Sequence, residues 1–102
     1  MKVPRIQSVS SLEGKRLLVT FVDGTQKIYD CKQILHLERF RFLNQEAFFK
    51  AVTVDPGGYG VSWNDEMDLS EYELWHNGVT VASNEIPARE DVESHLAPEN
   101  RA

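Results

Sequence analysis

The stretch that decides the fold reads Val52-Thr53-Val54-Asp55-Pro56-Gly57-Gly58-Tyr59-Gly60-Val61-Ser62-Trp63-Asn64-Asp65-Glu66-Met67-Asp68-Leu69-Ser70. Its apolar residues alternate with polar ones on both sides of Pro56-Gly57-Gly58, whose glycines supply the positive φ angles that a tight reversal needs. The earlier segment Phe21-Val22-Asp23-Gly24-Thr25 repeats this pattern around an Asp-Gly pair. Both segments predict β-hairpins. Neither contains a nucleophile with its base, a metal-ligand spacing or a phosphate-binding loop, so they predict architecture and not chemistry.

Residues 6–30 predict a three-stranded antiparallel sheet built from two successive hairpins. The pairs Glu13-Gly14 and Asp23-Gly24 separate the extended segments. We expect a two-residue turn at Asp23-Gly24 with a positive φ. The second strand, residues 16–22, is apolar on both faces, which predicts a position in the middle of the sheet with a helix packed against it.

The spacing of apolar residues changes to three and four between Cys31 and Phe49, which favours helices. We expect one short helix at residues 32–38 and a second helical turn near residues 44–50, with Asn44 as the N-cap. Residues 40–42 predict a short extended link between the two helices. The phenylalanines of this region are assigned to the core.

The hairpin around Pro56-Gly57-Gly58 joins residues 51–54 to residues 60–63, and Met67 and Leu69 carry the chain back over it. Ser70 and Glu73 then have the spacing of a capping box, which predicts a helical turn that ends near Trp75 and stops at Asn77-Gly78. An alternative remains open, in which Asn77-Gly78 forms a type I′ hairpin between residues 72–76 and 79–82.

Together these elements predict an α+β fold: a small single domain of antiparallel hairpins packed with one or two short helices. The domain is expected to span residues 1–83, because 102 residues suffice for one core. Residues 84–102 contain few large apolar side chains among charges and two prolines. They predict a frayed or disordered tail.

Composition restricts the classes of function. The formal charge of −5 and the pI of about 5.1 disfavour binding to a phosphate backbone and favour a basic partner. Cys31 is the only cysteine, so no intramolecular disulfide can form and a reducing compartment is expected. No apolar run approaches the roughly 20 residues of a membrane span, and the N-terminus lacks the apolar region of a signal peptide. We therefore expect a cytoplasmic protein without membrane contact.

Several segments in order resemble a known family. They are Val19-x-Phe21-x-Asp23-Gly24, Phe40-x-x-Leu43-x-x-x-x-x-Phe49-x-x-Val52-x-Val54, Gly60-Val61-x-Trp63, Asp68-Leu69-Ser70 and Leu74-Trp75. The chain resembles the domain-of-unknown-function 2442 family of small bacterial proteins over residues 9–75. The resemblance implies a compact α+β domain. It also implies a place in two-gene operons of the toxin–antitoxin kind, where a short acidic protein masks a partner.

Some proteins of that family carry an appended helix-turn-helix domain. Residues after Trp75 contain too few apolar side chains to build such a unit, so DNA binding is not carried over to this chain. The family brings no catalytic residues that could be transferred.

The candidate partner-binding residues are Asp65, Glu66, Asp68, Glu71 and Trp75. Four of them, with Glu73, concentrate carboxylates within nine positions, a density that could bind a divalent cation. The spacing lacks the EF-hand pattern, so solvated acids at a turn and a helix start are the favoured interpretation. No metal or cofactor is therefore expected. Tryptophan is enriched at interface hot spots, which adds Trp75 to the set, whereas Trp63 is predicted to be mostly buried.

The hypotheses of a catalytic function and of nucleic-acid binding have weaker support in the sequence. The histidines at positions 36, 76 and 95 are scattered, and Cys31 has no adjacent base, so no catalytic residue is predicted. The cations near the helical region could contact nucleic acid if aligned, but a mixed surface is favoured: Lys32, Arg39, Arg41 and Lys50.

We expect a non-enzymatic interaction module that binds another small protein or itself, with the antitoxin-like partner of a small operon as its specific form. The first alternative is a regulatory domain linked to DNA binding. The second is a small enzyme, which would require a polar-lined pocket beside His36 or Asp68.

Overall fold

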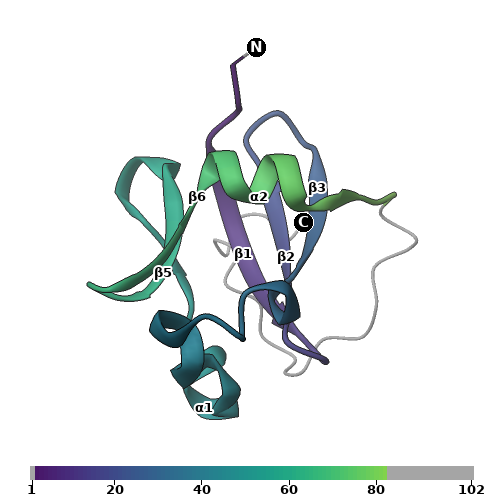
Figure 1. The fold of residues 1–102 in the computed structure, drawn as a ribbon. Helices are drawn as coiled ribbons and strands as arrows, with labels where there is room; N and C mark the ends of the chain where they lie inside the picture. Colours follow the sequence, from purple (N-terminus) through teal and green to yellow (C-terminus); the bar gives the residue numbers. More distant parts are fainter. Residues whose placement is uncertain (1, 83–102) are drawn as a thin grey trace.

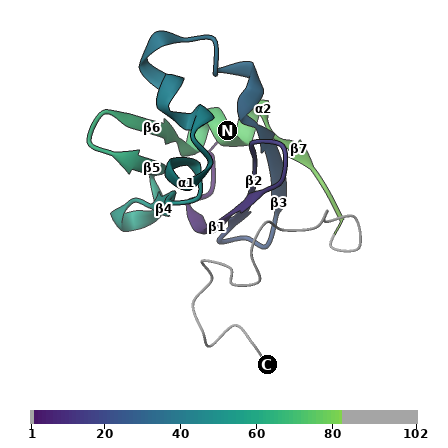
Figure 2. The same cartoon turned by 90° about the horizontal axis from the view of Figure 1, so that it is seen from below.

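Two antiparallel sheets lie side by side in the computed structural model, which describes residues 2–82 (Figures 1 and 2). The larger sheet has the order β1-β2-β3-β7, with bounds Ile6–Leu12, Arg16–Phe21, Gln26–Asp30 and Val79–Thr80. The smaller sheet has the order β4-β5-β6, with bounds Thr53–Val54, Gly60–Asn64 and Met67–Ser70. Two α-helices, α1 (Glu46–Phe49) and α2 (Glu71–Asn77), accompany the 3₁₀ helices η1 (Cys31–Gln33), η2 (Glu38–Asn44) and η3 (Pro56–Gly58). The α+β prediction is confirmed, and the predicted tail lies outside the described residues.

The first three strands confirm the predicted antiparallel sheet. The middle strand β2 pairs with β1 through Val9 and Val19 and with β3 through Leu17 and Tyr29. The turn after β2 differs from the two-residue prediction. The N–H of Phe21 donates to the carbonyl of Thr25 at 2.8 Å, so three residues form the loop, and Gly24 takes the positive φ of 94°. A three-residue loop with a glycine in this conformation keeps the right-handed twist of the two strands.

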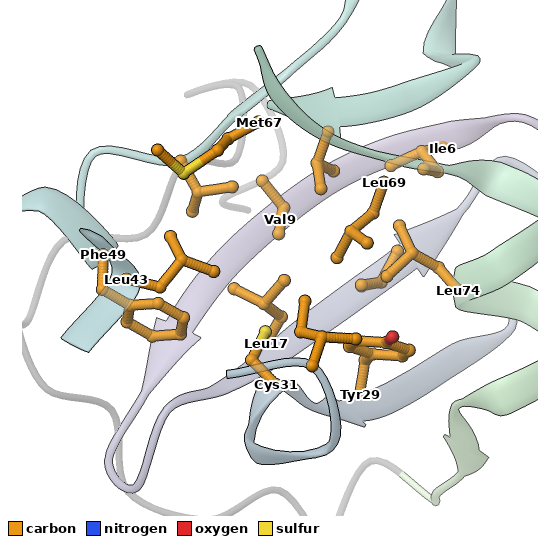
Figure 3. Packing of buried hydrophobic residues seen from close by; sticks show 14 of the residues in the cluster. Ile6, Val9, Leu17, Tyr29, Cys31, Leu43, Phe49, Met67, Leu69 and Leu74 are labelled. Carbon is orange, nitrogen blue, oxygen red and sulfur yellow. The ribbon is translucent and has the colours of Figure 1, made fainter. Parts of the chain in front are cut away.

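The core lies on one face of the larger sheet. Leu17 of β2 points into it, together with Leu69 from the smaller sheet and Leu74 from α2 (Figure 3). Val19 and Phe21 of β2 belong to the same buried cluster. The cover of β2 on this side is therefore a second sheet as well as helices. Leu18 points to the opposite face and is also buried, with 3% of its surface exposed. The prediction of a central strand that is apolar on both faces is confirmed.

Residues 31–44 form successive 3₁₀ turns, so the predicted helix at residues 32–38 is wrong. The N–H groups of Ile34, Leu37 and Phe40 each donate to the carbonyl three residues earlier, at 2.9, 3.0 and 3.0 Å. The predicted extended link at residues 40–42 belongs to η2 and is also wrong. Apolar residues recur here at every third position, Cys31, Ile34, Leu37, Phe40 and Leu43, and side chains three apart share one face of a 3₁₀ helix. All but Leu37 are buried.

Helix α1 lies inside the predicted helical region but begins later. Gln45 occupies the N-cap position without a side-chain cap bond, so the prediction of Asn44 as N-cap is wrong. The Asn44 amide instead donates to the carbonyl of Arg41 at 3.1 Å, which closes the end of η2. Phe49 of α1 is fully buried, as predicted, whereas Phe42 leaves 46% of its surface exposed and is not a core residue.

The smaller sheet confirms the third hairpin. Gly57 and Gly58 have φ angles of 82° and 79°, and a Cβ on Gly58 would lie 2.5 Å from the carbonyl oxygen of Ile6. Trp63 of β5 is mostly buried, as predicted. Its ring stacks on Phe49 at 6.2 Å and its indole N–H donates to the Phe49 carbonyl at 2.9 Å, so it does face a helical phenylalanine.

Helix α2 follows β6 directly. The Ser70 hydroxyl accepts a hydrogen bond from the Glu73 N–H at 3.1 Å, and Gly78 ends the helix, as predicted. The alternative hairpin at Asn77-Gly78 is wrong. Residues after Gly78 cannot pair with a segment that is helical, and β7 instead pairs with β3 through Ile28 and Val79.

Candidate functional site

A groove of about 410 Å³ separates the 3₁₀ turns from strand β6 and helix α2. We call it the β6 groove. One wall comes from residues 34–40 and the other from β6 and the first turn of α2. Its lining residues are Ile34, Leu37, Arg39 and Phe40 on the first wall and Asp68, Leu69, Ser70 and Glu73 on the second.

Strand β6 is an edge strand, since within the described residues it pairs only with β5. The Glu71 N–H donates to the carbonyl of Tyr59 at 2.9 Å, and Ser70 lies opposite Gly60. Hydrogen-bonded and non-hydrogen-bonded pairs alternate in an antiparallel ladder. Ser70 and Asp68 are therefore in non-hydrogen-bonded pairs, and their main-chain N–H groups point away from β5.

This orientation gives β6 an open edge, defined here as the N–H and C=O of Asp68 and the N–H of Ser70. The hydrogen bonds found among residues 2–82 outside the ladders include none to these three groups. Asp68, Leu69 and Ser70 all line the β6 groove. The open edge therefore faces a hollow in the surface.

Glu73 explains why the Ser70 N–H stays open. A capping box would return its carboxylate to that N–H. Instead, the buried Tyr29 hydroxyl donates to Glu73 Oε2 at 2.7 Å and ties α2 to β3. Burial, together with this hydrogen bond, raises the pKa of Tyr29, so the phenol remains a donor.

The charges of the β6 groove are unequal on its two walls. Asp68 and Glu73 stand on the β6 side. Arg39 stands opposite with its guanidinium 4.7 Å from the centre of the Phe40 ring. The Arg41 side chain nearby pairs with Glu38. One wall thus presents carboxylates beside main-chain donors, and the other presents a single cation over apolar side chains.

The structure distributes the predicted partner-binding residues over several places. Asp68 lies in the β6 groove, and Asp65 and Glu66 are exposed in the turn that enters β6. Asn64 Oδ1 holds this turn by accepting from the N–H groups of Glu66 and Met67, both at 2.8 Å. These three carboxylates therefore follow one another along one end of the smaller sheet.

The other two predicted residues lie elsewhere. Glu71 lines a separate hollow of about 370 Å³ next to Arg5 and Tyr59. Trp75 is partly buried. Its ring meets Phe21 edge to face at 4.9 Å, and the Lys27 ammonium lies 4.3 Å from its centre. Lys27 also donates to the Trp75 carbonyl at 2.6 Å, so this indole helps to join α2 to the larger sheet.

Within residues 2–82, the structure does not bring the candidate catalytic and metal-binding side chains together. Burial, aided by Asp30, raises the pKa of Cys31 to about 12, which keeps the thiol protonated at neutral pH. Between residues 2 and 82 no three His, Cys, Asp or Glu side chains gather as a metal site. A polar-lined pocket does border Asp68, and its lining also includes Ser70 and Glu73. The Ser70 hydroxyl accepts from the Glu73 N–H as the cap of α2, and the Glu73 carboxylate accepts from Tyr29.

The cations near the 3₁₀ turns form a mixed surface. Lys32 lies 3.2 Å from the Asp30 carboxylate and donates to the carbonyl of Gly14 at 2.7 Å, and Arg41 pairs with Glu38. Two of the four cations considered for nucleic acid are thus held by neighbouring oxygens.

The family is shown by comparison with family models. The model described as "Protein of unknown function (DUF2442)" matches residues 6–80, about three quarters of the chain. The chain belongs to this family. No curated protein and no solved structure matches it. The DUF2442 match spans both sheets and the β6 groove. In the part of the chain that the structure describes, no helix has the length and apolar character needed to cross a membrane.

Sequence reasoning found one side of the β6 groove and missed the other. Asp68 was identified from the density of carboxylates. Ile34 and Leu37 were placed on a regular helix at residues 32–38, because apolar spacings of three and four were taken together as one period, and Arg39 was assigned to a mixed charged surface. The signal that could have located them is the strict three-residue repeat from Cys31 to Leu43.

Proposed function

We propose that this DUF2442 chain is a non-enzymatic interaction module that binds a basic region of another small protein through the acidic end of its smaller sheet. The observation that carries the proposal is the coincidence of three features there: the β6 groove, the open edge of β6, and the carboxylates of Asp65, Glu66 and Asp68. Exposed sheet edges are one of the recurring surfaces at which folded domains bind extended peptide segments.

Electrostatics favours a basic partner. The chain has a formal charge of −5, and the three acidic side chains at this end would attract a positive surface and speed association. The resemblance to components of toxin–antitoxin-like operons supports a partner encoded beside this chain, which the acidic protein would mask in the cytoplasm.

Co-expression with the product of the adjacent gene tests the proposal. We expect the two proteins to co-purify at low salt and to separate as the salt concentration rises, because exposed charges are screened. Reversing the charge at Asp65, Glu66 and Asp68 to lysine should abolish the complex. The control reverses Glu13 and Asp23, exposed acids on the turns of the larger sheet, and should leave the complex intact. Separation of the unmodified proteins at low salt would contradict the proposal.

A further inference from the structure

We infer that the β6 groove receives an extended segment of the partner as an added strand along β6, with alternating apolar and basic side chains. This inference rests on the proposed function and specifies how the partner is recognised. Main-chain hydrogen bonds would supply affinity, and the side chains of alternate residues would supply specificity.

The main chain of β6 is the first observation. The ladder with β5 directs the N–H and C=O of Asp68 and the N–H of Ser70 outward, and all three face the groove. They span two residue steps, about 7 Å along a strand. An extended segment laid beside β6 could therefore form up to three main-chain hydrogen bonds without any change in the fold.

The contact between Tyr29 and Glu73 is the second observation. In a completed capping box the Glu73 carboxylate would occupy the N–H of Ser70. The hydrogen bond from Tyr29 holds that carboxylate at 2.7 Å instead. The strand edge is thus kept available by a buried tyrosine on the other sheet.

The lining of the groove sets the side-chain pattern of the segment. Leu69 points to the core side of β6, and Ile34 and Leu37 face it across the groove, where Leu37 is 39% exposed. Asp68 points to the solvent side. Because successive side chains of a strand alternate between faces, an added strand would direct apolar side chains toward Leu37 and basic ones toward Asp68.

The same charges argue against a second copy of this chain as the occupant. Pairing two β6 strands edge to edge would bring their Asp68 carboxylates close together, and like charges opposite one another destabilise a sheet. Acidic side chains on a short edge strand are a known protection against such pairing. The occupant is therefore a different, basic chain.

The experiment uses the full chain labelled for NMR and a synthetic peptide of alternating valine and lysine as the probe. We expect saturable binding at millimolar concentration or below. We also expect hydrogen exchange at the Asp68 and Ser70 amides to slow at least several-fold, because both become hydrogen-bonded. The Leu69 amide, already in the ladder, should change little. A peptide of alternating valine and glutamate should not bind.

Methylated peptides separate strand addition from charge attraction. A valine–lysine peptide with N-methyl groups on alternate amides keeps its charge but can present one edge without N–H donors. If the inference holds, methylating one set of alternate amides abolishes binding and methylating the other set leaves it unchanged. Equal binding of both methylated peptides would overturn it.

Two variants of one residue provide the matched test on the protein. Asp68→Ala removes the carboxylate and keeps the outward N–H, whereas Asp68→Pro removes both. Proline is tolerated on an edge strand where its nitrogen faces solvent, and thermal melting would verify the fold of each variant. We expect Asp68→Ala to weaken peptide binding and Asp68→Pro to abolish it. Equal affinities for the two folded variants would refute strand addition.

The natural partner distinguishes failure of this inference from failure of the proposed function. A partner that binds the full chain without slowing exchange at Asp68 and Ser70 would overturn strand addition and leave the interaction module standing. Absence of any complex with the adjacent gene product contradicts the proposed function itself. Absence of peptide binding with a partner complex present overturns the inference alone.

Discussion

The outer edges of strands β3 and β6 differ in their main-chain hydrogen bonding. Strand β7 returns after α2 and pairs with β3 at Lys27 and Ile28, and the Val81 N–H extends this pairing to the Gln26 carbonyl at 3.0 Å. Strand β6 receives no such strand among the described residues and faces the β6 groove. The difference indicates that one edge is closed for stability, while the other is kept short, acidic and accessible.

The largest expected effect comes from the buried side of β6. Leu69 is 6% exposed and packs in the core, so Leu69→Ala should lower the free energy of unfolding by roughly 2–5 kcal/mol. The matched control is Val79→Ala in β7, where 66% exposure predicts a change within about 0.5 kcal/mol. Urea denaturation measures both. Similar decreases in the free energy of unfolding for the two variants would show that the Val79 side chain stabilises the fold in addition to the main-chain hydrogen bonds of β7.

The next largest effect is expected at alkaline pH, which should lower the free energy of unfolding. Burial raises the pKa of Cys31 from 9.0 to about 12, so between these values the unfolded chain releases a proton that the folded chain retains. This stability is complete below about pH 9 and falls by about 1.4 kcal/mol per pH unit above it. The raised pKa of Tyr29 acts in the same direction. Denaturation at a series of pH values measures the fall.

The variant Cys31→Ala is the control for this pH dependence. It removes the thiol, so the part of the alkaline slope that belongs to Cys31 should disappear. A slope that is unchanged in this variant would contradict the assignment.

A smaller effect on stability, with a direct effect on the open edge, is expected for Tyr29→Phe. Loss of the donor to Glu73 should cost roughly 1–2 kcal/mol. The released Glu73 carboxylate can then reach the Ser70 N–H and complete the capping box. Hydrogen exchange at Ser70 should slow as a result. Tyr72→Phe, on an exposed tyrosine of α2, is the control and should leave this exchange rate unchanged.

The smallest change in stability is expected for Asp68→Thr. Exposed edge positions tolerate substitution within about 0.5 kcal/mol. Removing the carboxylate should nevertheless permit β6 edges of two molecules to pair, so sedimentation should reveal concentration-dependent dimers. Asp65→Thr, in the preceding turn, should remain monomeric at the same concentrations. A monomeric Asp68→Thr variant would show that charge is not what keeps this edge free.

The sequence predicted those parts of the fold that depend on local signals. Alternation identified the strands, glycines such as Gly24 and Gly57 marked the turns, and Ser70 with Gly78 marked the ends of α2. The stretch from Cys31 to Leu43 was misassigned, because spacings of three and four were taken together as an α-helical period, although the strict repeat of three residues matches the 3₁₀ turns that the hydrogen bonds show.

The candidate site was predictable only in part for a related reason. The carboxylate of Asp68 is visible in the sequence, but the accessibility of its main chain depends on where β7 pairs. The partner of Glu73 was missed because Tyr29 is 44 positions away. Long-range contacts of this kind leave no local pattern. The predicted capping box was therefore half correct: the Ser70 hydroxyl accepts from the Glu73 N–H, but the Glu73 carboxylate accepts from Tyr29 and not from the Ser70 N–H.

The two tryptophans are fluorescent reporters of different sheets, since Trp63 lies in β5 and Trp75 of α2 packs against β2. Trp63 reports the smaller sheet through its stack on Phe49, and Trp75 reports the larger one through its contact with Phe21 beneath the Lys27 ammonium. Each indole has a different polar neighbour, so their emission spectra should differ in the folded state. Single-tryptophan chains, made by Trp63→Phe or Trp75→Phe, would therefore show by fluorescence whether the sheets melt as one cooperative unit or in sequence.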